Sequence, residues 1–277
     1  MLIRSVLFTP ATRLDRLPRA LSSGADLVIV DLEDGVGEAD KDNARAAFVD
    51  LVGRNFDGSA DRIGLRINSL GSAAGIRDMA ALLDCAAWPG VLVVPKVNAA
   101  AEVTQMAGLV AGRGTRLLVT PESATGLAHA AKILAAAPAD AIVGYGSADH
   151  MAETGGTMGV ESLSWGRGQI VNAAATRGLT VLDGVWLDYK DESGLEAEAR
   201  LVKSVGFSGK IAIHPDQIPV INRVFSPTES ELETARAMIE ASESAGGGAF
   251  SFNGKMVDPP VLARAHRLME FTNRSST

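Results

Sequence analysis

The chain has 277 residues, of which 47% are hydrophobic, and this content suffices for one large core in the size range of a single α/β barrel. Its formal net charge of −7 and isoelectric point near 5.2 argue against a general nucleic-acid-binding protein, because such proteins need an excess of lysine and arginine. The single cysteine, Cys85, has no partner for an internal disulfide. No apolar stretch reaches the about 20 residues of a membrane span. We therefore expect a cytoplasmic protein with no nucleic-acid or membrane partner.

Short runs rich in β-branched residues alternate with longer segments rich in alanine and leucine, as in parallel strands covered by helices. The pattern predicts eight strands, at residues 6–9, 27–32, 63–67, 91–97, 117–120, 141–144, 180–187 and 210–213. It predicts helices between them at residues 13–22, 73–84, 102–111, 125–135, 166–177 and 194–205. Eight such units over about 210 residues favour a closed TIM (β/α)8 barrel over an open doubly wound sheet. We place this catalytic domain at residues 1–225.

The remaining residues, 226–277, read as a helical extension that serves as a lid. A charged helix is predicted at 228–244 and a last helix at 261–271. Between them, Gly246, Gly247 and Gly248 are either a hinge or an ordinary flexible linker, and the residues favour neither reading.

Polar side chains follow the predicted strands, and in a TIM barrel these strand ends form the active face. Glu122 and Asp149 follow adjacent strands, where two single carboxylates can hold one Mg²⁺ and leave positions open for water and substrate oxygens. Capping of the helices that follow explains the same two carboxylates equally well. Asp31, Glu33 and Asp34 add negative charge at the same end of the barrel, and they are candidates for hydrogen bonds to metal-bound water.

Three groups of basic residues are candidates for substrate binding. Arg66 ends an otherwise apolar strand, and its planar fork suits a carboxylate or an enolate oxygen. Lys96 can orient a carboxylate, pair with an acid or form a Schiff base, and the sequence does not choose among these. Arg13, Arg16 and Arg19 recur with helical spacing, which fits either a solvated helix face or contacts with the phosphates of a nucleotide-bearing substrate.

The order of these motifs resembles the citrate lyase β-subunit-like lyases, which include malyl-CoA and citramalyl-CoA lyases, within the HpcH/HpaI aldolase/citrate lyase superfamily. The resemblance covers nearly the whole chain and rests on the segments 4–10, 24–26, 31–34, 66–68, 95–96, 122–123, 183–185, 189–191, 206–210 and 213–218, together with Asp149. No single motif is decisive, but their order and spacing together are specific.

The resemblance implies that Glu122 and Asp149 ligate Mg²⁺, that Arg66 contacts the thioester side of the substrate, and that the segment from Phe8 to Arg16 lies near coenzyme A. It also implies a homotrimer, in which Asp258 of the C-terminal lid enters the active site of a neighbouring subunit. Asp258 precedes Pro259, so a helix cap with proline at the first helical position is a strong alternative.

Three positions depart from the family pattern. Pro10-Ala11-Thr12 stands where the family shows Pro-Gly-Asn, Ala148 and His150 flank Asp149 in place of an acidic residue and leucine, and Pro121 precedes Glu122. These changes border the thioester and metal sites, so they bear on substrate identity more than on reaction class.

We therefore expect an Mg²⁺-dependent carbon–carbon lyase that cleaves a short carboxylated 3-hydroxyacyl thioester, carried by coenzyme A or a carrier protein, into an acyl thioester and a 2-oxo acid. A class II aldolase acting on free 2-oxo acids and a non-catalytic barrel that binds thioesters are the alternatives.

Overall fold

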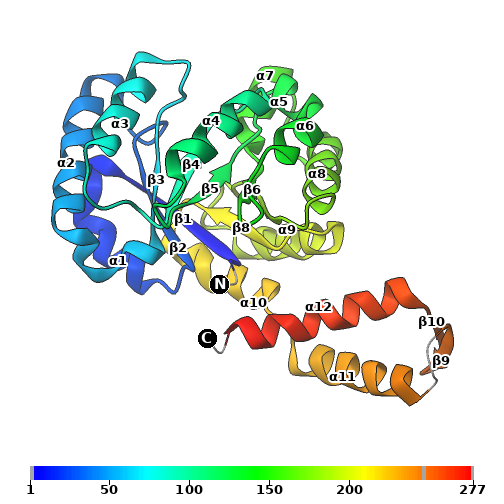
Figure 1. Ribbon diagram of the computed structural model, residues 1–277. Helices are drawn as coiled ribbons and strands as arrows, with labels where there is room; N and C mark the ends of the chain where they lie inside the picture. Colours follow the sequence, from blue (N-terminus) through cyan, green and yellow to red (C-terminus); the bar gives the residue numbers. More distant parts are fainter. Residues whose placement is uncertain (1–2, 245–247, 276–277) are drawn as a thin grey trace. The chain divides into compact units, whose positions relative to one another are not determined.

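The computed structural model describes residues 3–244 and 248–275, and eight parallel strands in sequence order form a closed barrel (Figure 1). Each strand pairs with the next along the chain, and β8 closes the barrel by pairing with β1. This arrangement confirms the predicted TIM barrel. The strands are β1 (Ser5–Pro10), β2 (Leu27–Asp31), β3 (Ile63–Arg66), β4 (Val91–Val94), β5 (Arg116–Val119), β6 (Ile142–Gly144), β7 (Thr180–Asp183) and β8 (Gly209–Ala212).

Branched apolar side chains fill the inside of the barrel. Because successive side chains of a strand point to opposite faces, every second residue of these runs faces inward. The inward set forms one buried cluster, made of Ile3, Val6, Leu27, Ile29, Val91, Val93, Leu118, Ile142, Leu182 and Ile211. The middle of the barrel is therefore a packed apolar core, and a cavity can open only at its ends, where the last residues of the strands and the loops after them lie.

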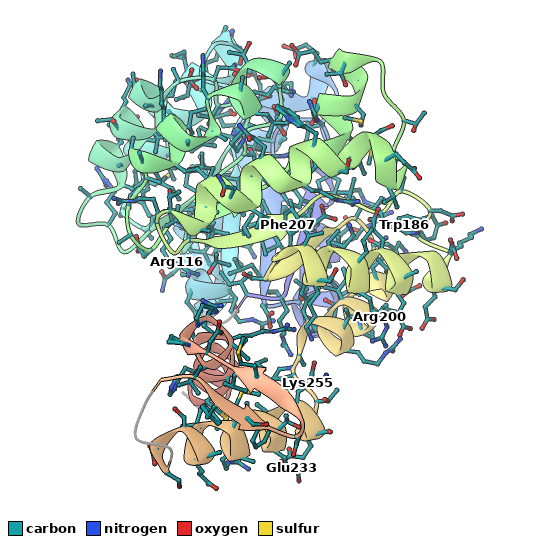
Figure 2. The ribbon with its side chains drawn as sticks, turned by 90° about the vertical axis from the view of Figure 1, so that its right-hand side faces the viewer. Arg116, Trp186, Arg200, Phe207, Glu233 and Lys255 are labelled. Atoms are coloured by element: carbon teal, nitrogen blue, oxygen red, sulfur yellow. The ribbon has the colours of Figure 1, made fainter. Side chains whose placement is uncertain are left out.

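Helices cover the outside of the barrel, and Figure 2 shows them from a second direction, with Arg200 on α9 and Trp186 on the loop before it. They are α1 (Leu17–Ser22), α2 (Lys41–Gly53), α3 (Ala73–Leu83), α4 (Ala100–Val110), α5 (Ala124–Ala128), α6 (Ala130–Ala135), α7 (Ser147–Thr154), α8 (Val160–Ala175), α9 (Glu192–Val205) and α10 (Ile218–Phe225). Short 3₁₀ turns lie at Ala11–Arg16, Glu38–Asp40, Asn55–Gly58, Ala60–Arg62 and Pro215–Gln217.

Several elements end earlier or break where the pattern predicts continuity. The predicted helix at 13–22 begins as a 3₁₀ segment with a non-helical Arg13, and the one at 125–135 is interrupted at His129. β4 ends at Val94 because Pro95 follows and Lys96 has a φ of +54°, in the left-handed region. β7 ends at Asp183, well before the predicted residue 187, and at Gly184, the next residue, a Cβ atom would overlap the side chain of Ser147.

Residues 226–275 form a second compact unit, distinct from the one that spans residues 3–225. It contains α11 (Glu229–Ser244), the antiparallel hairpin of β9 (Phe250–Phe252) and β10 (Lys255–Val257), and α12 (Pro259–Ser275). Helices α11 and α12 pack against each other, with Leu232, Ala235 and Ala265 buried. The predicted hinge at Gly246 and Gly247 lies outside the described residues. The lid role of this unit stays a prediction.

Across the described ranges 3–244 and 248–275, no helix is both long and apolar enough to cross a lipid bilayer. The predicted cytoplasmic location stays a prediction.

Candidate active site

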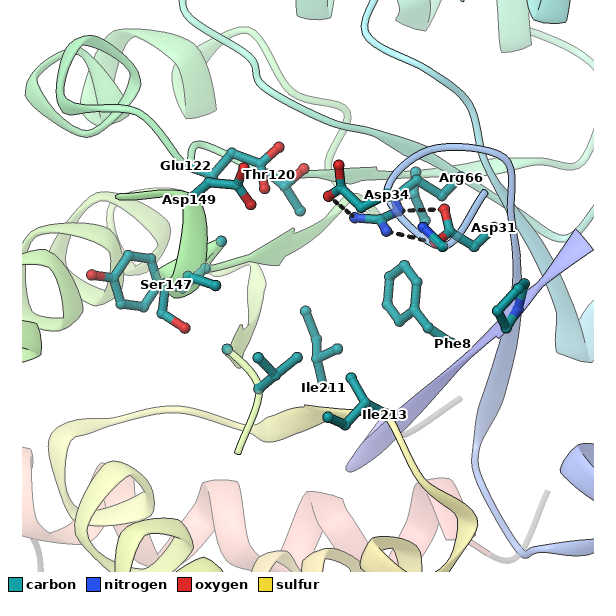
Figure 3. Close-up of a pocket in the computed structure, with 18 residues that line it drawn as sticks. Phe8, Asp31, Asp34, Arg66, Thr120, Glu122, Ser147, Asp149, Ile211 and Ile213 are labelled. Atoms are coloured by element: carbon teal, nitrogen blue, oxygen red, sulfur yellow. Dashed lines mark hydrogen bonds and ion pairs between the residues drawn. The ribbon is translucent and has the colours of Figure 1, made fainter. Parts of the chain in front are cut away.

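A cavity of about 340 Å³ opens at the carboxyl ends of the barrel strands (Figure 3). One side of it is polar and the other is apolar, and five of the predicted polar site residues reach its wall. The lining residues are Phe8, Pro10, Asp31, Asp34, Gly35, Arg66, Val93, Thr120, Glu122, Tyr145, Gly146, Ser147, Ala148, Asp149, Gly184, Val185, Ile211 and Ile213. The closed barrel thus brings together side chains that lie far apart in sequence.

Arg66, the last residue of β3, is held by a fork-to-fork pair with Asp31, the last residue of β2. Its Nε and Nη2 atoms each donate to one oxygen of Asp31, at 2.7 Å in both cases. The same oxygens accept from the peptide N–H groups of Glu33 and Gly35, so the carboxylate of Asp31 is well satisfied at 2% exposure. The Cζ atom of the Arg66 guanidinium lies over the ring of Phe8, 4.8 Å from the ring centroid. Asp31 therefore orients Arg66, and its predicted contact with metal-bound water stays a prediction.

The third nitrogen of Arg66 faces two further carboxylates. Its Nη1 atom lies 3.1 Å from Oε2 of Glu33 and 3.3 Å from Oδ2 of Asp34. Glu33 is buried, and this burial raises the pKa of its carboxyl group, although the charges of Arg66 and Lys96 oppose the rise. Asp34 is more exposed and lines the cavity. The end of β2 and the loop after it thus place three acids around one guanidinium.

Glu122 and Asp149 reach the same cavity from the loop after β5 and from the first turn of α7. Glu122 is 4% exposed, and burial together with the charges of Glu33 and Asp149 raises its pKa to about 8. Its side chain lies against Gly146, where a Cβ atom would overlap it. This close approach explains the glycine before α7, and no pattern in the sequence predicts it.

Neither of these carboxylates caps the helix that follows it. The side chain of Ser123 caps α5 by accepting from the N–H of Gly126 at 2.8 Å. The N-cap of α7 is Gly146, and that helix start has no side-chain cap. Neither carboxylate is thus an N-cap, but Asp149 lies in the first turn of α7, where its negative charge also suits the helix N-terminus.

Lys96 contacts two of these carboxyl groups, one through its peptide N–H and one through its side chain. Its peptide N–H donates to Oε1 of Glu122 at 2.6 Å, and its Nζ atom lies 3.0 Å from Oε1 of Glu33. Burial favours the neutral amine, but the hydrogen bond with Glu33 and the charges of Asp34 and Asp149 outweigh it and raise the pKa of Lys96. A firmly protonated amine is a poor nucleophile, which argues against the Schiff-base reading.

The donor set of the cavity fits a hard divalent cation. Among the described residues, the five carboxyl groups form ion pairs with two cations, Arg66 and Lys96, so five negative charges stand against two positive ones when all are ionised. Within the described residues, no group of three or more His, Cys, Asp or Glu side chains is arranged so that it could hold a metal ion by itself. Glu122 and Asp149 could therefore supply two oxygen ligands and leave the other positions to water and substrate, as Mg²⁺ prefers.

A second cavity of about 290 Å³ adjoins the first and shares Phe8, Pro10 and Ile213 with it. Exposed Arg16 and Arg19 line it, as do residues not singled out for binding from the sequence, among them His214 and Pro215. Arg13 does not line it. The non-helical backbone at Arg13 turns its side chain to Asp15, with which it forms hydrogen bonds of 2.9 and 3.0 Å.

Two positions that depart from the family pattern have different surroundings. Ala148 lines the first cavity, whereas His150 turns into the core at 4% exposure and forms a 2.8 Å hydrogen bond with the hydroxyl of Tyr145. Burial lowers the pKa of His150. His150 therefore braces the turn that carries Asp149 rather than facing the cavity.

Asp258 caps α12, and its Oδ1 atom accepts from the N–H of Val261 at 3.2 Å. The capping alternative is thus realised in the structure. A catalytic role for Asp258 stays a prediction.

Comparison with known proteins identifies the family. A model described as HpcH/HpaI aldolase/citrate lyase matches residues 4–215, and one described as a C–C bond lyase of the TIM-barrel fold matches residues 167–272. The chain belongs to the HpcH/HpaI aldolase/citrate lyase family. It is a carbon–carbon lyase of the citrate lyase β-subunit and malyl-CoA lyase type.

Two relatives show how far this likeness extends along the chain. A citrate lyase subunit beta-like protein of Mycobacterium tuberculosis is 38% identical over 270 residues, covering 95% of this chain and 93% of the relative. An L-malyl-CoA/beta-methylmalyl-CoA lyase of Rhodobacter capsulatus is 35% identical over 293 residues, covering 95% and 92%.

Solved structures share the fold of this chain, and several of them hold ligands. CitE of M. tuberculosis in complex with magnesium, acetoacetate and coenzyme A superposes with a TM-score of 0.82 at 36% identity, covering 98% of each chain. RipC of Yersinia pestis superposes with a TM-score of 0.73 at 40% identity, covering 83% of this chain and 98% of that one. Magnesium, the cofactor predicted from the sequence, is also present in other CitE structures.

Proposed function

We propose that the protein cleaves a short carboxylated 3-hydroxyacyl-CoA of the citramalyl, malyl or citryl type into an acyl-CoA and a 2-oxo acid. The observation that carries the proposal is the pair of adjoining cavities. One contains the acidic group around Glu122 and Asp149, and the other is lined by Arg16 and Arg19. Such a pair suits a substrate with a chelating hydroxy acid at one end and phosphates at the other.

In this proposal Glu122 and Asp149 hold Mg²⁺. When bound, the ion chelates the carboxylate and hydroxyl of the part released as a 2-oxo acid and lowers the pKa of that hydroxyl. The hydroxyl gives up its proton to a water molecule, its carbon becomes the new carbonyl, and the electron pair of the broken carbon–carbon bond passes to the thioester as an enolate.

The chain's own side chains act on the thioester half. Arg66, held in place by Asp31, stabilises the enolate oxygen, and Phe8, Arg16 and Lys96 contribute to substrate binding, whereas Arg13 is paired with Asp15. Asp258 from a neighbouring chain of a homotrimer delivers the proton that turns the enolate into the acyl-CoA.

The basic second cavity favours this reading over an aldolase that acts on free 2-oxo acids, since a free acid carries no phosphates to place there. A carrier-protein thioester lacks the nucleotide of coenzyme A, so it offers fewer phosphate groups for Arg16 and Arg19 to bind.

A lyase assay over citramalyl-, malyl-, citryl- and 3-hydroxy-3-methylglutaryl-CoA, each beside its free acid, tests the proposal. We expect acyl-CoA release from at least one thioester, none from the free acids, and loss of activity in EDTA. Cleavage of the free acids alone would support the aldolase. An Asp258→Asn variant in the same assay should lose acyl-CoA release while it retains Mg²⁺ binding. If light scattering shows a monomer, the active site is not shared between chains.

Mg²⁺ binding should depend on pH because Glu122 must lose its proton before it can ligate a cation. Its pKa lies near 8 in the metal-free protein, so the affinity should fall about tenfold for each pH unit below that value and level off above it. Calorimetric titration with Mg²⁺ between about pH 6 and 9 measures this. A Glu33→Gln variant, which removes one of the charges that raise the pKa, should shift the break to lower pH. An affinity that stays constant from pH 6 to 8 would contradict the assignment of Glu122.

A further inference from the structure

One residue, Lys96, contacts both proposed metal ligands, and it uses a different group for each. Its peptide N–H donates to Glu122 at 2.6 Å, and its ammonium lies 3.7 Å from Oδ1 of Asp149. Lys96 therefore contacts both carboxylates at once, although its side chain does not line the cavity.

The backbone contact depends on an unusual conformation. Lys96 has a φ of +54°, which a residue with a Cβ atom rarely adopts outside a functional or tightly constrained site. Neighbouring groups hold it there, since Asn98 Nδ2 donates to the carbonyl of Lys96 at 3.0 Å and the N–H of Val97 donates to Thr120 at 3.3 Å. In this conformation the N–H occupies one oxygen of Glu122.

In this structure the ammonium already rests mainly on two acids of the loop after β2. It lies 3.0 Å from Oε1 of Glu33 and 3.4 Å from Oδ1 of Asp34, both closer than Asp149. A divalent cation on Asp149 would repel an ammonium at this distance strongly. The flexible four-carbon stem of lysine lets the charge withdraw toward Glu33 without moving the backbone.

We propose that Lys96 is a positioning residue that sets the metal affinity of the site. Its peptide N–H orients Glu122 toward the cation, while its ammonium, held by Glu33 and Asp34 at 3.7 Å from Asp149, opposes a cation on Asp149 and moves further toward Glu33 when the cation binds. The inference rests on the proposed function in taking Glu122 and Asp149 as the metal ligands.

The test is calorimetric titration of the full chain with Mg²⁺ at constant pH and salt. Lys96→Met keeps the N–H and the length of the side chain but removes the charge, so it should bind Mg²⁺ at least about tenfold more tightly than the wild type. Lys96→Arg, which keeps the charge, should bind with nearly wild-type affinity. Lys132→Met makes the same change of net charge at an exposed site on α6 and should leave the affinity unchanged.

Equal or weaker Mg²⁺ binding by Lys96→Met would overturn the inference. Should that variant fail to fold in a thermal melt, Lys96→Gly takes its place, because glycine accepts the positive φ and retains the N–H. Tighter binding by this variant supports the competition, and unchanged or weaker binding rejects it. A wild type that binds no Mg²⁺ would instead refute the proposed function itself, so the two failures are distinguishable.

Discussion

Glu122→Gln and Asp149→Asn are each expected to lower lyase activity by at least about a thousandfold and to abolish measurable Mg²⁺ binding. Both changes keep the shape of the side chain but replace a charged oxygen ligand by a neutral amide, and a catalytic cation contributes several kcal/mol of charge stabilisation. Steady-state turnover with the best thioester of the panel and calorimetry with Mg²⁺ measure the two effects.

Glu122→Gln should not unfold the protein. The pKa of this carboxyl is raised in the folded state, so ionisation of Glu122 opposes folding increasingly as the pH rises from its ordinary value toward 8. A neutral amide escapes that cost, and we expect a melting temperature near pH 8 no lower than that of the metal-free wild type. Glu161→Gln, on the exposed face of α8, is the matched control and should be fully active. Full wild-type activity in chelator, or a Lys96 adduct trapped by borohydride, would refute the metal mechanism in favour of a Schiff base.

Arg66→Lys is expected to lower kcat by roughly a hundredfold while KM changes much less. Two nitrogens of the guanidinium donate hydrogen bonds to Asp31, and the third forms ion pairs with Glu33 and Asp34. A lysine ammonium cannot hold a bidentate carboxylate and also meet charge that develops on the substrate. An interaction made mainly in the transition state appears in kcat rather than in KM.

The control for Arg66→Lys is the same change at Arg4, which grips Asp26 through Nε at 3.1 Å and Nη2 at 2.7 Å beside the opposite end of β1. Each change should lower the free energy of unfolding by roughly 1–3 kcal/mol, because each leaves a carboxylate with fewer hydrogen bonds. Only the change at Arg66 should affect turnover. If KM alone rises in Arg66→Lys, the arginine is a ground-state anchor for the thioester.

The sequence by itself determined the barrel and the set of candidate residues. Strand and helix periods are local properties, and eight apolar runs separated by helical segments leave few other folds. The rule that strand ends form the active face then places Asp31, Arg66 and Glu122 at one end of the barrel from their position in the chain alone. The ordered motifs indicated the family, which the comparisons confirm.

Tertiary structure decided how those residues are used, because hydrogen bonds across the barrel and burial depend on packing that no local pattern encodes. Asp31 and Arg66 are 35 positions apart and become one bidentate pair. Ser123 rather than Glu122 caps α5, and a non-helical Arg13 turns away from the second cavity. The raised pKa of Glu122 arises from burial beside like charges, and Lys96 reaches that carboxylate only because Pro95 and a left-handed backbone end β4 at Val94.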